Sequence, residues 1–159
     1  MHKKFVNKLV NEYQFVSVGE YTIRDKSRRG TKIHLDRAHE VEGYTGIYVL
    51  VLHTKDGTKV VKIGESLNLG RRLDNNFTVT TENRVQHQPT NIRVSKFLQN
   101  ILGNEGAQVE VLVHRIPLQS VNIFESIIQT SYHKQGEEVL IRQFADMYRE
   151  LPVLNPTMR

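Results

Sequence analysis

Residues 43–77, GYTGIYVLVLHTKDGTKVVKIGESLNLGRRLDNNF, decide the fold. The stretch holds two short apolar runs, residues 47–52 and 59–63, which are rich in β-branched side chains. The turn signal Lys55-Asp56-Gly57 lies between them. Two β-branched runs on either side of such a turn predict a β-hairpin.

A helix is expected directly after this hairpin. Ser66 or Asn68 can cap it, because a short polar side chain accepts hydrogen bonds from the first backbone amides of a helix. Leu69 and Leu73 lie about one helical turn apart and would share one face. Arg72 is then expected to project from the helix back toward the sheet.

Three polar side chains of this stretch are expected to converge. They are the phenol of Tyr48, the ammonium of Lys62 and the guanidinium of Arg72, and no carboxylate lies among them. Ammonium and guanidinium groups form strong, charge-assisted hydrogen bonds with phosphate oxygens. The grouping therefore suits the binding of a phosphate.

At this point the chain resembles the GIY-YIG nucleases. Gly46-Ile47-Tyr48 matches the first triplet of that family, and Lys62-Ile63-Gly64 stands where the second triplet is usually Tyr-Ile-Gly. Residues 137–142, EEVLIR, and 152–155, PVLN, look like the acidic helix and closing asparagine of the family. Four separated blocks in the right order are fairly specific, whereas one triplet would be weak. The resemblance is greatest to the phage and restriction endonuclease branch.

The resemblance implies a role for each polar residue of the first two blocks. Tyr48 would activate water, and because the pKa of a free tyrosine is about 10, Lys62 would be needed to favour the phenolate. Arg72 would bind the scissile phosphate with its planar fork of donors. Arg71 is the alternative if the register of the helix differs by one residue.

The last two blocks supply the metal ligand and a closing amide. By resemblance, Glu137 would bind one Mg²⁺ ion, for which Mn²⁺ is expected to substitute, and Asn155 would orient the site or contact the backbone. Glu138 is the alternative ligand, but neighbours on a helix point about 100° apart, so both cannot face one metal. Glu65 stands where the family motif often has a second lysine.

Each of these residues also has an ordinary structural interpretation. A tyrosine in a central strand is commonly a core residue, a glutamate in the first turn of a helix commonly serves the helix dipole, and Arg72 could simply pair with Asp74 or Glu65. Of the seven histidines, only His87 is expected to touch substrate. His53, His114 and His133 are interpreted as structural or surface residues.

Composition bounds the class of protein. The chain has 159 residues, 38% hydrophobic and 25% charged, which fits one globular domain or a small domain with an added arm. Its net charge of +5 favours polyanionic partners, although many proteins that bind none share such a charge. The absence of cysteine excludes a disulfide framework and a thiolate metal site. A soluble, cytoplasmic protein without membrane association is expected.

The N-terminal segment, residues 1–42, is interpreted as an accessory to a core spanning residues 43–159. A short helix is expected within residues 3–13 and a strand at residues 15–18. Residues 21–42 are polar and basic, and they either follow a DNA backbone or form an ordinary solvated hairpin or loop. In the first case the contacts would come from Arg24, Arg28, Arg29 and Lys32.

Downstream of the Arg72 helix, residues 77–91 are expected to form a polar, substrate-facing insertion. A helix at 91–102, a strand at 109–113, a helix within 120–134 and a helix from Glu137 to Tyr148 should follow. The fold class is therefore α/β (α+β), with a small three-stranded mixed or antiparallel sheet flanked by helices. Further DNA contacts are assigned to Arg71, Arg84, His87, Arg93 and Lys96, although charged side chains on a wet helix face are usually only solvated.

The function predicted from these residues is Mg²⁺-dependent endonucleolytic cleavage of double-stranded DNA, of the restriction or host-DNA-degrading type. A homo-oligomer would provide the two active sites that cutting both strands calls for. The alternatives are a structure-specific repair nuclease and a catalytically inactive nucleic-acid-binding module. A complete set of Tyr48, Arg72 and Glu137 argues against the inactive module, since a binding protein has no need of an acid among phosphates.

Overall fold

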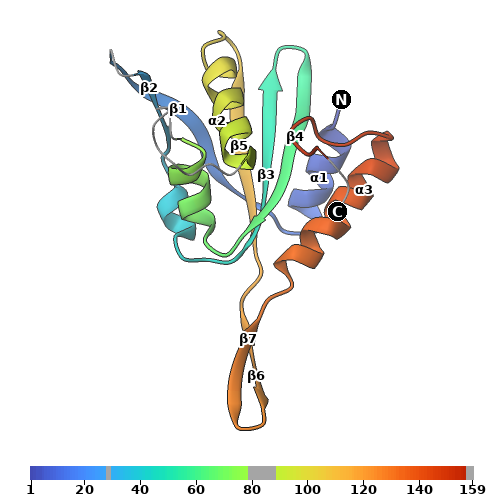
Figure 1. The fold of residues 1–159 in the computed structure, drawn as a ribbon. Helices are drawn as coiled ribbons and strands as arrows, with labels where there is room; N and C mark the ends of the chain where they lie inside the picture. Colours follow the sequence, from blue (N-terminus) through green and yellow to red (C-terminus); the bar gives the residue numbers. More distant parts are fainter. Residues whose placement is uncertain (28–29, 79–88, 157–159) are drawn as a thin grey trace.

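The computed structural model describes residues 1–27, 30–78 and 89–156, with the backbone alone for residues 24–27 and 30–32. Helices lie on both faces of a central antiparallel sheet (Figure 1). In chain order the elements are α1 (Lys3–Asn11), β1 (Val16–Ser27), β2 (Gly30–Leu35), η1 (Ala38–Val41), β3 (Gly46–Thr54), β4 (Gly57–Ser66), η2 (Arg71–Asn76), α2 (Pro89–Ile101), β5 (Gln108–Arg115), β6 (Gln119–Ile123), β7 (Ser126–Thr130) and α3 (His133–Tyr148).

The predicted hairpin is the β3–β4 pair. Its strands pair in antiparallel register from Gly46 with Ser66 to Thr54 with Gly57, with one register shift after Leu50. Gly57 closes the turn at φ 129°, a conformation that side chains disfavour. The expected strand at 109–113 is β5, which pairs with β3 along its whole length.

The sheet is larger than the three strands expected from the sequence. Within the described residues it has five strands in the order β2-β1-β5-β3-β4, and the α+β class is confirmed. The additional strands come from the basic N-terminal stretch, where Tyr21 pairs with Leu35 and Ile23 with Ile33. Because β4 is an edge strand, its outer side is open to other parts of the chain.

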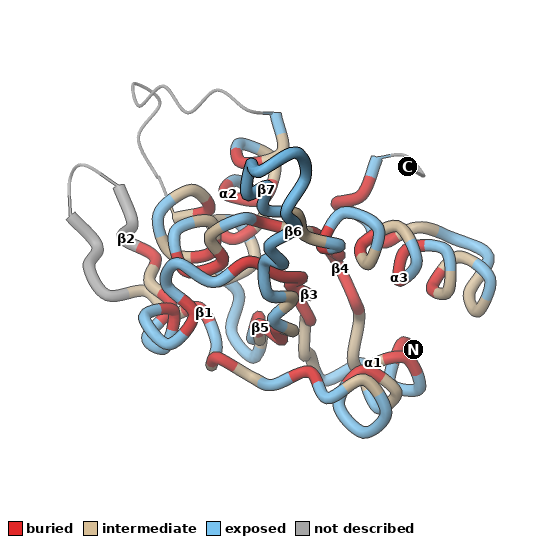
Figure 2. The backbone as a smooth tube through the Cα atoms, turned by 90° about the horizontal axis from the view of Figure 1, so that it is seen from below, coloured by how far each residue is buried: buried red, intermediate tan, exposed pale blue. Residues whose placement is uncertain are grey.

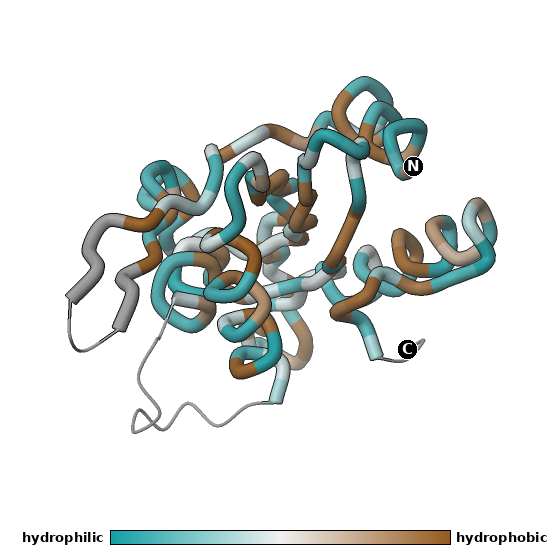
Figure 3. The backbone as a smooth tube through the Cα atoms, turned by 90° about the horizontal axis from the view of Figure 1, so that it is seen from above, coloured by the Kyte–Doolittle hydropathy of each residue, from teal (hydrophilic) through white to brown (hydrophobic). Residues whose placement is uncertain are grey.

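Side chains of alternate residues divide the core between the two faces of the sheet. Tyr48 and Leu50 lie in a cluster together with residues of η2 and α2, whereas Ile47 and Val49 lie in a cluster with residues of α1 and α3. Buried positions concentrate in the central strands, while much of the outer surface of α3 is exposed (Figure 2). Hydrophobic and hydrophilic positions alternate along the helices, as packing on a sheet requires (Figure 3).

The N-terminal segment supplies side chains to both clusters. Phe5 and Leu9 lie one turn apart on α1 and are buried beneath α3, whereas Tyr21 and Leu35 are buried on the other face. Its proposed DNA-contacting side chains, those of Arg24, Arg28, Arg29 and Lys32, lie outside the described residues.

Residues 119–130 form a β-hairpin, and the helix expected within 120–134 is wrong. The spacing of Ile123, Phe124, Ile127 and Ile128 fits one face of a helix. The chain instead turns at Phe124, so that Val121 pairs with Ile128 across two strands. A turn between two short β-branched runs can place these apolar residues on one face, and their spacing in the sequence is then the same as on one face of a helix. Helix α3 starts at His133, four residues before the expected start at Glu137.

Among the described residues, no helix combines the length and the apolar character needed to cross a lipid bilayer.

Candidate active site

The phenol of Tyr48 lies across the edge strand. Tyr48 is opposite Gly64 in the β3–β4 pair and is 1% exposed. A Cβ atom at Gly64 would overlap the Cζ and hydroxyl oxygen of Tyr48 and would lie 2.8 Å from its Cε1. The glycine of the second triplet is therefore required by the tyrosine of the first, because its missing side chain provides the space for the ring.

Lys62 lies on the same face of the sheet as Tyr48. It pairs with Leu50, two residues along β4 from Gly64, so Lys62 and Tyr48 are diagonal neighbours across the two strands. Its side chain is buried, with 6% of the residue exposed. The β3–β4 register thus puts the side chains of Tyr48 and Lys62 on one face of the sheet.

Arg72 lies on a short helix that is capped as expected. The Oδ1 atom of Asn68 accepts hydrogen bonds from the amides of Arg71 at 3.1 Å and Gly43 at 2.8 Å. Residues Arg71–Asn76 then adopt the wider π-helical turn, a form that is often found at functional sites. The cap fixes the start of the helix and hence the direction of the arginines.

The guanidinium of Arg72 is only partly satisfied. Its Nη1 donates a long hydrogen bond of 3.5 Å to Oδ1 of Asn91, and its Cζ lies 6.0 Å from the ring centre of Phe77. Its Nε is buried and has no hydrogen-bond partner among the described residues. A buried donor without a partner is costly, so this atom suggests a ligand that accepts hydrogen bonds.

Phe77 links Arg72 to Tyr48. The Tyr48 and Phe77 rings meet edge to face with their centres 5.5 Å apart. Tyr48 and Phe77 belong to one buried cluster with Leu73 of η2, so Tyr48 and the helix that carries Arg72 lie on the same side of the sheet.

Tyr21 supports the Arg72 helix from the N-terminal segment, a role that the sequence did not reveal. Its hydroxyl donates a 2.6 Å hydrogen bond to the carbonyl oxygen of Leu73. Burial raises the pKa of Tyr21 well above its usual value, and Tyr48 and Asp74 add to the rise. The hydroxyl therefore stays protonated and keeps its donor role. Asp74 makes a second link by accepting a 2.9 Å hydrogen bond from the amide of Leu35.

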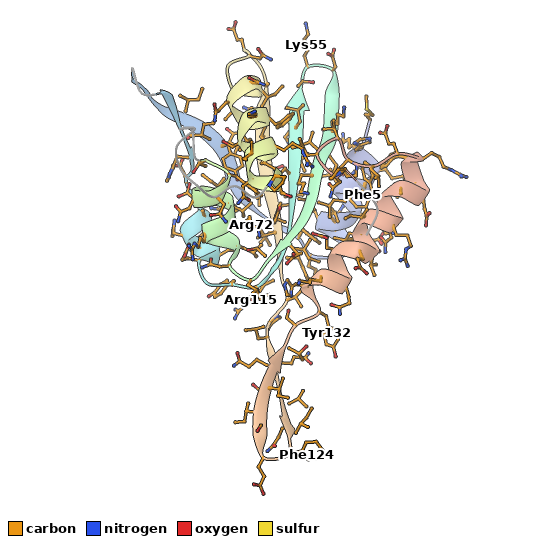
Figure 4. The ribbon with its side chains drawn as sticks, in the orientation of Figure 1. Phe5, Lys55, Arg72, Arg115, Phe124 and Tyr132 are labelled. Atoms are coloured by element: carbon orange, nitrogen blue, oxygen red, sulfur yellow. The ribbon has the colours of Figure 1, made fainter. Side chains whose placement is uncertain are left out.

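A cleft of about 360 Å³ opens at the free edge of β4, between η2 and the first residues of α3. Arg72 lies on the η2 side of this edge, and Tyr132, next to the start of α3, lies at the other (Figure 4). The cleft is lined by Glu65, Ser66, Leu67, Asn68, Arg71, Arg72, Asn76, His133 and Lys134. Of the side chains proposed for the site, those of Arg71 and Arg72 therefore line it directly.

The side chains of His133 and Glu65 lie against each other inside the cleft. Their Nε2 and Oε2 atoms are 3.0 Å apart, and their side chains are 7% and 14% exposed. His133 was expected to be a structural or surface residue. Its position four residues before Glu137, on one helix face, was the signal that could have singled it out. The pair lies in the same cleft as Arg71 and Arg72.

Glu137 lies on the inner face of α3, one turn beyond His133. It is 5% exposed, whereas its neighbour Glu138 is half-exposed. The helix comes close to the sheet at Gly136, where a Cβ atom would lie 2.6 Å from Cδ1 of Ile47. Among the described residues, no three His, Asp or Glu side chains are grouped to hold a metal ion together.

Asn155 binds the backbone of the edge strand. Its Oδ1 accepts a 2.9 Å hydrogen bond from the amide of Ile63, and its Nδ2 donates a 2.8 Å bond to the carbonyl of the same residue. The amide of Leu154 donates to the carbonyl of Val61 at 2.9 Å. The closing segment thus covers part of the free edge of β4 and fixes the strand that carries Lys62 and Gly64.

The remaining proposed DNA contacts differ in their surroundings. Arg71 and Lys96 are exposed, whereas Arg93 is half-buried with an Nη1 atom that has no hydrogen-bond partner among the described residues. Arg84 and His87, with most of the expected insertion, lie outside the described residues.

Comparisons with known proteins give a match in structure alone. The fold matches a mutant of bacteriophage T4 EndoII with a TM-score of 0.63, 17% identity and coverage of 94% of this chain and 97% of the other. The chain has the GIY-YIG nuclease fold. A restriction endonuclease, HPY188I in complex with product DNA, aligns at a TM-score of 0.49 and 18% identity, over 98% of this chain and 85% of its own. At the level of sequence, no family model and no curated protein matches this chain.

Proposed function

We propose that this protein is a DNA endonuclease that hydrolyses phosphodiester bonds at the free edge of β4. The observation that carries the proposal is the Arg72 guanidinium, which lines a cleft while its buried Nε has no partner among the described residues. A phosphate oxygen is the acceptor that suits this donor best, because guanidinium–phosphate hydrogen bonds are charge-assisted. The fold shared with EndoII, itself named as an endonuclease, supports the same assignment.

Tyr48 and Lys62 would carry out the proton transfer. As the oxygen of a water molecule bonds to phosphorus, its proton would pass to the Tyr48 phenolate. The bond from phosphorus to one bridging oxygen then breaks, and that oxygen takes up a proton from solvent water. Lys62 is buried on the same face of the sheet as Tyr48, and an ammonium close to the phenol would favour the phenolate, which supports Lys62 as the partner of Tyr48. Arg72 would hold the phosphate and offset the charge on its oxygens.

Glu137 fits the proposed Mg²⁺ site. Mg²⁺ keeps several water ligands and is commonly bound through one or two carboxylates together with substrate phosphates, so a single buried carboxylate is an adequate protein donor. When bound, the ion would polarise the phosphate and stabilise the departing oxygen. Glu137 has the inward orientation that this role needs, and Glu138 lies one helical position away from it.

Asn155 would act as a positioning residue. Both polar atoms of its side chain bind the backbone of Ile63, between Lys62 and Gly64. The side chain therefore fixes the strand on which Lys62 lies and over which the Tyr48 ring passes.

Double-stranded DNA is the substrate that we propose. The net charge of +5 favours a polyanion, and Arg71 and Lys134 line the cleft beside Arg72. Cations next to the site would release phosphate counterions on binding, so the affinity should fall with salt.

Incubation of supercoiled plasmid DNA with the purified protein, with and without Mg²⁺, tests the proposal. The wild-type chain and Glu138→Gln should cleave only when Mg²⁺ is present, whereas Glu137→Gln should bind DNA without cleaving it. Binding without cleavage by the wild-type protein would refute the nuclease and support the inactive binding module. Cleavage by Glu137→Gln at the wild-type rate would refute the metal assignment.

A further inference from the structure

Leu67 presents an apolar side chain in a cleft that is otherwise lined mainly by polar residues. It is 64% exposed, and it lines the cleft together with Arg71 and Arg72. Leu69, two residues further along the chain, is fully buried in the core. A single exposed leucine needs no explanation on most protein surfaces. Beside two arginines that are suited to a phosphate, however, it lies where the bases attached to that phosphate would be.

The backbone that carries Leu67 is fixed by hydrogen bonds. The hydroxyl of Thr45 donates a 3.0 Å bond to the carbonyl oxygen of Leu67. On either side of Leu67, the hydroxyl of Ser66 donates a 2.9 Å bond to the carbonyl oxygen of Asn68 and accepts a 3.1 Å bond from the amide of the same residue. The loop therefore presents the leucine from an ordered backbone, which reduces the entropy lost when the side chain binds.

The groups proposed for catalysis are recessed. Tyr48 and Glu137 are 1% and 5% exposed, and the Nε atom of Arg72 is buried. The cleft measures about 360 Å³, which is the size of a pocket for a small molecule. A double helix cannot enter such a space as a whole. One segment of backbone must therefore move out of its regular path to bring a phosphate to Arg72.

An apolar side chain inserted between two bases would produce this displacement. Leucine is one of the residues that DNA-bending proteins insert as wedges, and such a wedge partly unstacks one base step and kinks the duplex. Leu67 would gain the burial that it lacks in the free protein, which favours the insertion. Arg71 and Arg72 supply the positive charge that holds the backbone beside the opened step.

A further cation lies at the same end of the sheet. Gly46 pairs with Ser66 on one side and with Arg115 on the other. Figure 4 shows Arg115 far from Lys55, which marks the opposite end of the molecule. The Cζ of Arg115 lies 3.9 Å from the ring centre of Tyr44. Stacking uses the face of a guanidinium and leaves its edge for phosphate oxygens, so the kinked backbone has a second point of attachment.

We propose that Leu67 is a wedge that inserts into the base stack of duplex DNA beside the phosphate bound by Arg72. The inserted side chain unstacks one base step, and the kink brings the backbone into the cleft. The inference rests on the proposed endonuclease function. It makes Leu67 a positioning residue, because its side chain contacts bases and not the reacting atoms.

Single-turnover cleavage of two DNA duplexes tests the wedge. Sequencing of the wild-type products first identifies a cleaved position. One duplex is then fully paired, and the other carries a mismatch at the base step beside that position. Leu67→Ser should cleave the paired duplex about tenfold to a hundredfold more slowly than the wild type, because the burial of a leucine is lost. On the mismatched duplex the loss should shrink to less than about threefold, since a mismatched base is easier to unstack.

Two matched variants accompany this measurement. Leu67→Phe keeps an apolar wedge and should cleave the paired duplex at close to the wild-type rate. Val10→Ser removes an apolar side chain that is 43% exposed on α1, outside the lining of the cleft, and should cleave both duplexes as the wild type does. All of these side chains are exposed, so thermal melts should be unchanged.

Fluorescence of 2-aminopurine reports unstacking without any cleavage. With this base beside the cleaved position and Mg²⁺ omitted, binding of the wild-type protein should raise the fluorescence severalfold, because the unstacked base is no longer quenched by its neighbours. Saturating Leu67→Ser should leave the fluorescence at the level of free DNA.

The outcomes separate the wedge from the endonuclease. Wild-type cleavage of the paired duplex by Leu67→Ser would overturn the wedge and leave the endonuclease intact. An equal loss on both duplexes would also overturn the wedge, because the defect would then not lie in unstacking. A wild-type protein that neither binds nor cleaves DNA would overturn both proposals. A rise in fluorescence without cleavage would support the wedge and overturn only the endonuclease.

Discussion

Replacing Gly64 with alanine should displace the Tyr48 ring. Alanine normally stabilises a strand relative to glycine by about 0.5–1 kcal/mol, so any net loss of stability must come from the added methyl group. That carbon would lie 2.8 Å from Cε1 of Tyr48 and would overlap its Cζ and hydroxyl oxygen. Since carbon atoms pack at about 3.5–4.0 Å, the ring must move by roughly 1 Å or more.

Overpacking of this kind lowers the free energy of unfolding by about 1–3 kcal/mol, which urea denaturation would measure. A misplacement of about 1 Å can slow a reaction hundredfold, so single-turnover DNA cleavage should fall by a similar factor. In a Tyr48→Leu background the stability loss should disappear, because leucine lacks the clashing atoms. At Gly103 an added Cβ would make only an ordinary 3.7 Å contact with the Asn100 carbonyl oxygen, so Gly103→Ala is the control. Wild-type stability and cleavage in Gly64→Ala would refute the reasoning.

Three further changes test the supports of the site. Tyr21→Phe should lower the free energy of unfolding by about 1–3 kcal/mol at neutral pH, because it leaves a buried carbonyl unpaired. Above a pH of about 10, Tyr21 ionises in the unfolded chain, whereas its raised pKa keeps it protonated in the folded protein. The wild type therefore loses stability as the pH rises. Urea titrations should show that the difference in free energy of unfolding between the wild type and Tyr21→Phe becomes smaller. Gly136→Ala should destabilise the fold by about 1–3 kcal/mol, because the added Cβ atom would lie 2.6 Å from Cδ1 of Ile47 and 3.1 Å from Cδ1 of Ile116. Ile47→Val removes the closer of these atoms and should restore part of the loss in thermal melts; no rescue would contradict the contact. Asn155→Ala should cost about 1–3 kcal/mol and slow cleavage, and unchanged melting would contradict its hold on β4.

Local patterns were sufficient to predict the elements that lie close together in the sequence. The β3–β4 hairpin, the cap at Asn68 and helix α2 follow from turn residues, side-chain spacing and capping chemistry. Strand β5, which is also confirmed, was predicted from the alternation of Val109, Val111 and Val113 with the residues between them. Each of these signals is contained within a few residues, so no distant contact is needed to read it.

Contacts between distant segments could not be predicted in the same way. Tyr21 reaches Leu73 only because β1 joins the sheet beside β5. The many basic residues of β1 and β2 concealed the alternation of apolar and polar side chains that would have predicted two strands. Residues 119–130 were assigned the wrong element because helical and hairpin spacings coincide over so short a run. The His133–Glu65 pair likewise depends on how α3 crosses β4.

The central claim is that Arg72 and Glu137, on opposite sides of β4, act on the same phosphate. Single-turnover cleavage of one DNA substrate by Arg72→Ala, Glu137→Gln and the double variant tests it most directly. Each single change should slow cleavage by at least about a hundredfold, and because groups that act as a unit are not additive, the double variant should be no slower than the slower single variant. Wild-type cleavage by either single variant, or losses that multiply in the double variant, would contradict the claim.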